Sequence, residues 1–121
     1  MKRFEKIFIS KDELIVFSDL KVVLSKQTGF VLTMRQLVKM TGMNRTKLST
    51  GFLTLYGCSI KQYQLQQRIQ LAKRKLVITN LPVKAIAKDC GFTSEKNFFA
   101  YFKQKTGMPP GMYRKRYTRT A

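Results

Sequence analysis

The stretches GMNRTKLSTGF, residues 42–52, and GFTSEKNFFAYF, residues 91–102, carry the same pattern of residue types. In each, a glycine and a short polar run precede two large apolar residues that are spaced four apart. Residues four apart lie on one face of a helix. Each stretch therefore predicts a helix that begins after a glycine turn and packs one face against a core. The apolar pairs are Leu48 with Phe52 and Phe98 with Phe102.

The likeness extends on both sides of these stretches, with one extra residue in the second copy after the turn. Both copies predict a helix, a glycine turn and a second helix, which is the layout of a helix-turn-helix. Two such units in register are a stronger signal than one. A helical bundle in which the repeat only fills the core stays open as the alternative. The further matched pairs are Leu32/Leu81, Leu37/Ile86, Val38/Ala87, Thr41/Cys90, Gly42/Gly91, Met43/Phe92 and Gly57/Gly107.

Capping signals and turn residues divide the chain into seven predicted helices. Ser10 with Glu13 and Thr33 with Gln36 fit the capping box, and Asn44 fits a helix cap. A further cap is expected at Thr93 or Ser94. Gly29 is expected to end the helical stretch that precedes it, and Pro82 is expected to be the first residue of the fifth helix. The fold class is therefore all-α, with two helix-turn-helix subdomains joined by a long connector helix. The predicted helices are residues 11–26, 34–41, 45–56, 59–78, 83–90, 95–106 and 110–117.

Apolar residues at helical spacing are assigned to the core. Phe99 and Tyr101 cannot both point inward beside Phe98 and Phe102, so one of them is expected at the surface. Cys58 and Cys90 are expected to be small buried apolar residues. The core prediction comprises Leu14, Phe17, Leu20, Leu24, Leu37, Val38, Met40, Leu48, Phe52, Ile60, Tyr63, Ile69, Ala72, Leu76, Ile86, Ala87, Phe92, Phe98 and Phe102.

The charge of the chain points to a polyanionic partner. The 121 residues include 24 Lys and Arg but only 6 Asp and Glu, for a formal net charge of +18. The first 19 residues are balanced, so the excess lies in the rest of the chain, where Asp89 and Glu95 are the only acids. A charge of this size repels itself unless an anion offsets it. Nucleic acid is the first candidate, and an anionic membrane surface is the second.

Other chemistry finds little support in the composition. The chain has no histidine, its acids are scattered, and its two cysteines form no CxxC pair. A zinc site, a disulfide framework and general acid–base catalysis are therefore not expected. We predict no enzymatic activity, no metal and no cofactor. No apolar run is long enough for a membrane span or a signal peptide, so a soluble, cytoplasmic protein is expected.

The connector adds a geometric expectation. A helix of about 20 residues is about 30 Å long at ~1.5 Å per residue. Successive half-sites on one face of B-DNA lie ~34 Å apart. One chain is therefore expected to place two reading helices in adjacent major grooves, on an asymmetric sequence and without dimerising.

The stretch LPVKAIAKDCGFTSEKNFFAYFKQKTGMPPGMYRKR, residues 81–116, resembles the signature of the AraC/XylS family of bacterial transcription regulators. The shared features are I-A, G-F, a paired F..F, G-M-x-P and Y-R. The first unit, LTMRQLVKMTGMNRTKLSTGF, and the connector RIQLAKRKL fit as well, so the likeness covers residues 11–117. It implies a seven-helix domain that binds promoter DNA and acts on transcription, with RNA polymerase as a further partner.

The resemblance also implies which side chains meet base edges, because the family uses the exposed face near the start of each second helix. Ala100 departs from the family, which often has arginine there, and Phe99 and Tyr101 replace small or polar residues. The second unit is therefore expected to act mainly through phosphates. The implied base contacts are Arg45, Thr46, Ser49 and Thr50 in the first unit, and Glu95, Lys96 and Ala100 in the second.

Arg45 can pair bidentately with guanine, and the hydroxyls of Ser49 and Thr50 can meet base edges or phosphate oxygens. A phosphate contact or a solvated surface stays open as the alternative for each. Runs of basic residues, including the C-terminal cluster that ends with Arg119, are expected to contact phosphates or to add to the electrostatic field that attracts DNA. The predicted phosphate contacts are Lys47, Thr54, Arg35, Lys73, Arg74, Lys75, Lys103 and Arg114.

The predicted domain organisation is an arm or linker remnant at 1–10, the DNA-binding domain at 11–117 and a tail at 118–121. Within the domain the first unit covers 33–57, the connector 59–78 and the second unit 82–107. The domain is expected to be monomeric, either as a short stand-alone regulator or as a piece of a longer, dimeric one. Two rival functions stay open: a cationic membrane-surface protein, and a non-specific RNA or architectural DNA binder.

Overall fold

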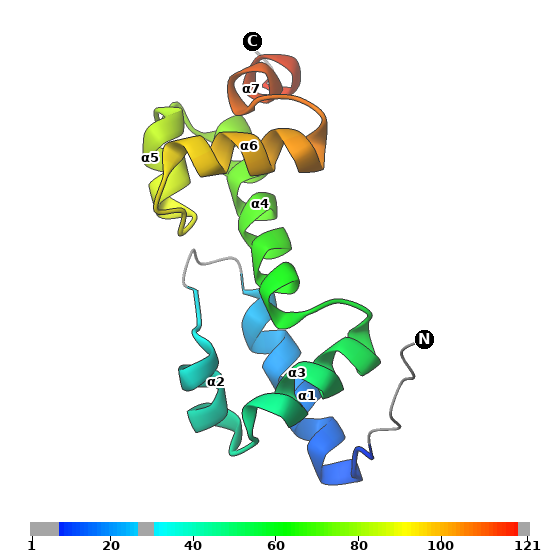
Figure 1. Cartoon of the computed structure of the whole chain (residues 1–121). Coiled ribbons are helices and arrows are strands. Elements are labelled where there is room, and N and C mark those ends of the chain that lie inside the picture. Colours follow the sequence, from blue (N-terminus) through cyan, green and yellow to red (C-terminus); the bar gives the residue numbers. More distant parts are fainter. Residues whose placement is uncertain (1–7, 27–30, 119–121) are drawn as a thin grey trace, which may run out of the picture. The chain divides into compact units, whose positions relative to one another are not determined.

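The computed structural model describes residues 8–26 and 31–118, and within these ranges the chain is all-α (Figure 1). Residues 1–7 of the predicted arm, the predicted break at Gly29 and the tail from Arg119 onward lie outside the described residues. The seven helices are α1 (Lys11–Ser25), α2 (Met34–Thr41), α3 (Arg45–Tyr56), α4 (Ile60–Ile78), α5 (Val83–Asp89), α6 (Glu95–Thr106) and α7 (Pro110–Tyr117).

The predicted helix bounds agree with the structure to within one residue. α2, α3, α6 and α7 match, whereas α1 ends one residue early because Lys26 is its C-cap. α4 begins at Ile60 because Ser59 precedes it as a cap, with its hydroxyl accepting from the Gln62 amide at 3.1 Å. The prediction for Pro82 was wrong by one position, since it is the N-cap of α5 rather than its first residue.

Side-chain caps explain where most of these helices begin. Ser10 and Glu13 form a complete capping box at α1, and Thr33 and Gln36 form another at α2. The Asn44 side chain accepts from the Lys47 amide at the start of α3. At α6 the cap is Ser94, which accepts from the Asn97 amide, and not Thr93. These contacts satisfy amides that would otherwise lack partners in the first turn.

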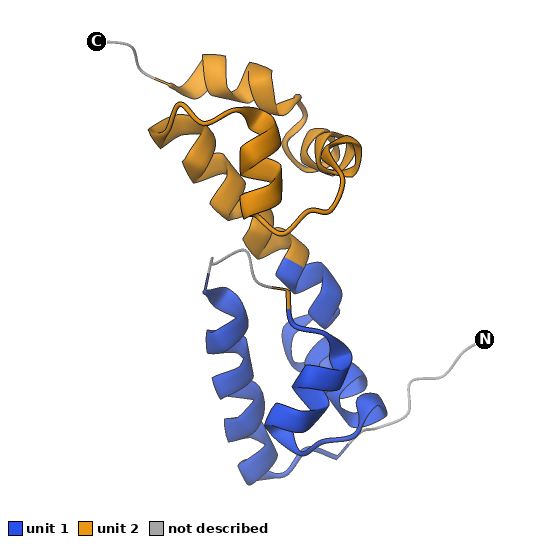
Figure 2. Ribbon diagram, turned by 90° about the vertical axis from the view of Figure 1, so that its left-hand side faces the viewer, with its two compact units in different colours: residues 1–26, 32–64 blue, residues 27–31, 65–121 orange. Residues whose placement is uncertain are grey.

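The chain forms two compact units, shown in blue and orange in Figure 2. Unit 1 holds α1, α2, α3 and the first residues of α4, up to Gln64. Unit 2 holds the rest of α4, from Leu65, together with α5, α6 and α7. α4 is thus one continuous helix that contributes residues to both units.

Unit 1 has its own hydrophobic core between α1 and the α2–α3 pair. Gln64 is the one buried polar residue in the described chain, and its amide group pairs with the backbone of Leu32 in both directions, at 2.9 and 3.0 Å. This pairing fixes the segment that leads into α2. The core residues are Phe17, Leu20, Leu24, Leu37, Met43, Leu48, Phe52 and Ile60.

Unit 2 has a second core around α4, α5 and α6. Tyr113 on α7 packs against it and makes an edge contact with the Phe102 ring at 5.4 Å between centroids. Because each unit buries its own set of apolar side chains, each helix-turn-helix packs against a separate hydrophobic core. The core residues are Ile69, Leu71, Ala72, Leu76, Ile86, Ala87, Cys90, Phe98 and Phe102.

Two core predictions were wrong, and four residues predicted as buried are only partly buried: Val38, Cys58, Tyr63 and Phe92. Leu14 is 42% exposed and Met40 is 55% exposed, because each lies beside the buried stripe of its helix rather than on it. Cys58 is only partly buried, whereas Cys90 is fully buried as predicted. Leu71 was missed, although it is buried next to Ala72.

No helix in the described ranges has both the length and the apolar character that a membrane crossing needs.

Candidate nucleic-acid interface

The turn of unit 1 joins α2 to α3 through Gly42. This residue has φ of +73°, a left-handed conformation that glycine adopts at little cost. The Thr41 hydroxyl donates to the Leu37 carbonyl at 2.8 Å and accepts from the Met43 amide at 3.2 Å. Met43 is buried in the core of unit 1. The turn is therefore fixed at both ends, and it sets the direction in which α3 leaves.

α3 buries one face and presents the other to solvent. Leu48 and Phe52 are fully buried, while Arg45, Thr46 and Ser49 are exposed. Thr50 is half-buried, which leaves part of its side chain accessible. The first turn of α3 contains no acidic residue. The structure thus places the four predicted base-contact residues of the first unit together at the accessible start of one helix.

Leu53 is a feature of this face that the sequence analysis missed. It is 49% exposed on α3, three positions after Thr50 and four after Ser49. Its place on the outward face can be read from that spacing. An apolar side chain among hydroxyls is suited to the methyl group of thymine.

Of the phosphate contacts predicted in unit 1, Arg35 on α2 and Thr54 on α3 are exposed. Lys47 is engaged elsewhere: its ammonium lies 3.1 Å from the Glu13 carboxylate and donates to the Phe8 carbonyl. The structure therefore directs this lysine toward the start of α1.

The turn of unit 2 joins α5 to α6 through Gly91, which has φ of +86°. Arg68 on α4 donates to the Gly91 carbonyl at 3.0 Å, and its guanidinium lies 4.8 Å from the centre of the Phe92 ring. Burial raises the pKa of the neighbouring Cys90 thiol to about 11, so this thiol stays neutral at physiological pH. The second turn is thus held by an arginine of the connector, which the sequence analysis did not foresee.

α6 repeats the arrangement of α3. Phe98 and Phe102 are buried, while Glu95, Lys96 and Ala100 are exposed, as is Lys103 further along the helix. Gln104 was missed by the sequence analysis and is also exposed, four residues after Ala100. Ala100 is therefore a short apolar side chain among exposed acidic, polar and basic ones on α6.

The prediction that Phe99 or Tyr101 lies at the surface is confirmed. Phe99 is 38% exposed, whereas Tyr101 packs against the core of unit 2 and contacts the Phe92 ring.

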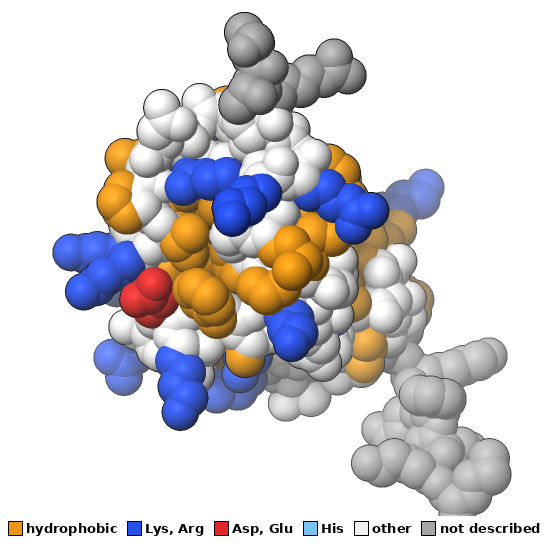
Figure 3. All heavy atoms as spheres, turned by 90° about the horizontal axis from the view of Figure 1, so that it is seen from above, with side chains coloured by type: hydrophobic (Ala, Val, Ile, Leu, Met, Phe, Trp, Pro, Cys, Tyr) orange, Lys and Arg blue, Asp and Glu red, His pale blue; other side chains and the backbone are white. Residues whose placement is uncertain are grey.

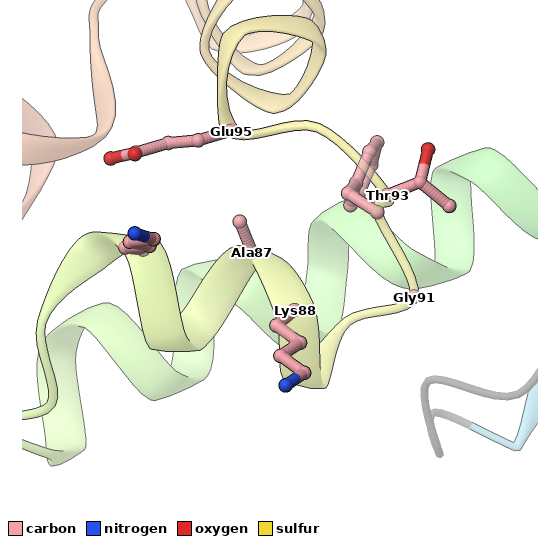
Figure 4. A pocket seen from close by; sticks show the side chains of 7 residues that line it. Ala87, Lys88, Gly91, Thr93 and Glu95 are labelled. Carbon is pink, nitrogen blue, oxygen red and sulfur yellow. The ribbon is translucent and has the colours of Figure 1, made fainter.

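A hollow of about 480 Å³ opens between α5 and the start of α6 (Figure 4). Ala87 points toward it from α5, while Thr93, which precedes α6, and Glu95, the first residue of α6, lie on opposite sides. Lys88 extends away from Glu95 in this view. The lining residues are Lys84, Ala87, Lys88, Gly91, Phe92, Thr93 and Glu95.

The remaining predicted phosphate contacts lie on α4 and α7. Lys73 is half-buried and Arg74 is exposed, while the Lys75 ammonium lies 3.9 Å from the Asp89 carboxylate. Arg114 donates through Nε to the Leu76 carbonyl at 2.9 Å and through a terminal nitrogen to the Thr79 carbonyl at 3.2 Å. Arg114 thus binds the end of α4, a structural role that its place in a charge run did not indicate.

Figure 3 shows the chain seen from above, with its side chains coloured by type. Lys and Arg side chains surround exposed apolar ones on this face, and acidic side chains are scarce there. The view agrees with the charge distribution along the sequence, in which Asp89 and Glu95 are the only acids after Asp19.

Comparison with known proteins decides the family. A family model described as a helix-turn-helix domain matches residues 37–116, which is more than half of the chain. A putative AraC-like transcription regulator of Streptomyces lividans is 35% identical over 83 residues. The chain belongs to the AraC family of transcription regulators. The AraC-type part that aligns covers 69% of this chain but only 27% of the Streptomyces protein.

Two other comparisons extend this result. The arabinose operon regulatory protein of Escherichia coli is 31% identical over 72 residues, or 60% of this chain and 25% of that protein. The AraC-type fold is shared with the DNA-binding domain of AdpA, whose crystal structure contains a target DNA. Against it the TM-score is 0.77 at 24% identity, over 84% of this chain and 91% of that one.

The C-terminal domain of AraT, a response regulator from Geobacillus stearothermophilus, gives a TM-score of 0.80 at 22% identity. This match covers 87% of the present chain and 88% of the AraT chain. The seven-helix fold predicted for this chain is therefore confirmed.

Proposed function

We propose that this chain binds double-stranded DNA in a sequence-specific manner at promoters and regulates bacterial transcription. The observation that carries the proposal is the pair of glycine turns, each followed by a helix with one fully buried face and one exposed polar face. These helices belong to a chain with a net charge of +18, which favours a polyanionic partner. Membership of the AraC family of regulators supports the same assignment.

In this proposal α3 reads bases through Arg45, Thr46, Ser49 and Thr50. α6 contributes through Glu95, Lys96 and the small Ala100, and relies more on phosphates. Arg35, Thr54, Lys73, Arg74, Lys75 and Lys103 are the proposed phosphate contacts. Arg114 is left out because its Nε and one terminal nitrogen already donate to the carbonyls of Leu76 and Thr79.

We further propose that the two units occupy successive major grooves. α4 has 19 residues, which corresponds to a length of about 28 Å. This length is comparable with one turn of B-DNA, so half-sites centred about 10 base pairs apart are expected. RNA polymerase is the proposed second partner. The proposed state of the domain itself is a monomer, located in the bacterial cytoplasm at the nucleoid.

Arg45→Ala tests the base-reading part of the proposal. A lost bidentate contact to guanine costs ~1–3 kcal/mol of discrimination, or roughly 5- to 150-fold in the dissociation constant. We expect this loss on the preferred duplex, with a much smaller loss on a scrambled duplex. Replacing Lys73, Arg74 and Lys75 with alanine should weaken binding to both duplexes about equally. Equal losses for Arg45→Ala on both duplexes would show that it contacts only the backbone.

The rival functions predict different outcomes in the same assay. An architectural or RNA-binding protein would show salt-dependent binding without a preferred duplex. A membrane-surface protein would bind anionic vesicles and fail to bind either duplex.

A further inference from the structure

Residues 8–26 and 31–118 contain three capping boxes, and one of them differs in charge. Residue N3 is a glutamine in two boxes, Gln36 with Thr33 at α2 and Gln62 with Ser59 at α4. At α1 the corresponding residue is Glu13, paired with Ser10. Since an amide oxygen performs this capping task in two helices, capping alone does not explain the carboxylate at α1.

The Glu13 carboxylate also forms an ion pair, a contact that an uncharged glutamine cannot make. The same Glu13 oxygen accepts from the Ser10 amide at 2.9 Å and lies 3.1 Å from the Lys47 ammonium. The pKa of Glu13 is held below its ordinary value, first by the Ser10 amide and then by Lys47. The carboxylate is therefore ionised at neutral pH.

Lys47 belongs to the first turn of α3, the proposed reading helix of unit 1. Its backbone amide is capped by Asn44, and its ammonium turns to Glu13 and to the Phe8 carbonyl. The Lys47 side chain is only 25% exposed, in contrast to its neighbour Arg45, which is exposed. A cation at this position is also opposed by the positive end of the helix dipole, and the carboxylate relieves that repulsion.

We propose that Glu13 determines specificity by withholding Lys47 from the phosphates of DNA. A free lysine beside the reading helix would add a sequence-independent contact and raise affinity for any duplex. With Lys47 held by Glu13, the start of α3 meets DNA through Arg45 and the hydroxyl side chains. This inference rests on the proposed function, and it replaces the predicted phosphate contact of Lys47.

Glu13→Gln is the direct test, because glutamine retains the cap and removes the charge. Asp12→Asn is the matched control, as it removes one negative charge from an exposed residue in the same first turn. The readout is the slope of log affinity against log salt concentration on a scrambled duplex. Relative to Asp12→Asn, we expect Glu13→Gln to steepen the slope by ~0.9, the value of one added phosphate contact. Affinity for the scrambled duplex should rise several-fold, so the specificity ratio should fall.

A double-mutant cycle assigns the effect to Lys47. Lys47→Gln alone should leave the slope nearly unchanged, because its ammonium is already withheld. Lys47→Gln combined with Glu13→Gln should abolish the added slope. The inference is overturned if Glu13→Gln and Asp12→Asn give equal slopes, or if Lys47→Gln alone lowers the slope by ~0.9. The measurement on Lys47→Gln alone still tests the inference if Glu13→Gln fails to fold. A wild-type chain that binds no duplex would instead overturn the proposed function, and this inference with it.

Discussion

Gly51 lies in the middle of α3, where a helix normally disfavours glycine by about 1 kcal/mol relative to alanine. A Cβ atom built there would stand 2.3 Å from Cζ and 2.8 Å from Cε2 of Phe17. Phe17 is fully buried in the core of unit 1. Glycine at this position therefore allows α3 to pack directly against α1.

Gly51→Ala should destabilise the protein by about 1–3 kcal/mol, because the overlap with a buried ring outweighs the better helix propensity of alanine. Gly111→Ala is the matched control, since a Cβ at this position on α7 meets no atom within 4 Å. We expect the control to be neutral or slightly stabilising. Urea unfolding followed by circular dichroism measures both. An unchanged or raised midpoint for Gly51→Ala would contradict the packing described for α1 and α3.

The role of a residue was predictable where its partner is close in sequence, and it was not predictable where the partner is distant in sequence. Ser10 and Asn44 cap helices through contacts three positions away, so their roles can be read from short motifs. Gly51 is explained by Phe17, which lies 34 positions earlier in the chain. The contact of Lys47 with Glu13 has the same character. Such pairs follow from the packing of α1 on α3, which no spacing rule indicates.

At the scale of elements, the C-terminal end of α4 accepts hydrogen bonds from a side chain of another helix. Its last carbonyls lack partners within the helix. Arg114 of α7 donates to the carbonyl of Leu76 in the last turn and to that of Thr79, the residue after α4 ends. The helix bounds were predictable because caps and glycines mark them. The exposure of Leu14 and Met40 was not, since a short helix has few residues with which to define its buried side.

Arg114→Ala should destabilise unit 2 by about 1.5–3 kcal/mol, the range for hydrogen bonds that involve a charged group. Lys115→Ala, at the exposed neighbouring position, should stay within about 0.5 kcal/mol of the wild type. Thermal unfolding followed by circular dichroism compares the two. If Arg114 instead serves mainly as a phosphate contact, the two variants will unfold alike, and Arg114→Ala alone will lower the salt slope of DNA binding.

At the scale of the whole molecule, charge and duplication act together. Each unit has its own core, its own glycine turn and its own outward helix face. Each unit can therefore present its outward helix to DNA from a core of its own. The two faces differ: α3 carries Arg45 with several hydroxyls, whereas α6 carries Ala100 between Lys96 and Lys103. An asymmetric binding site with one dominant half is therefore expected.

Selection of bound duplexes from a random pool tests this central claim most directly. We expect two enriched blocks of unlike sequence, centred about 10–10.5 base pairs apart. The stronger block should be lost in Arg45→Ala, which would assign it to α3. A single block, or a bound pool without any enriched sequence, would contradict this claim.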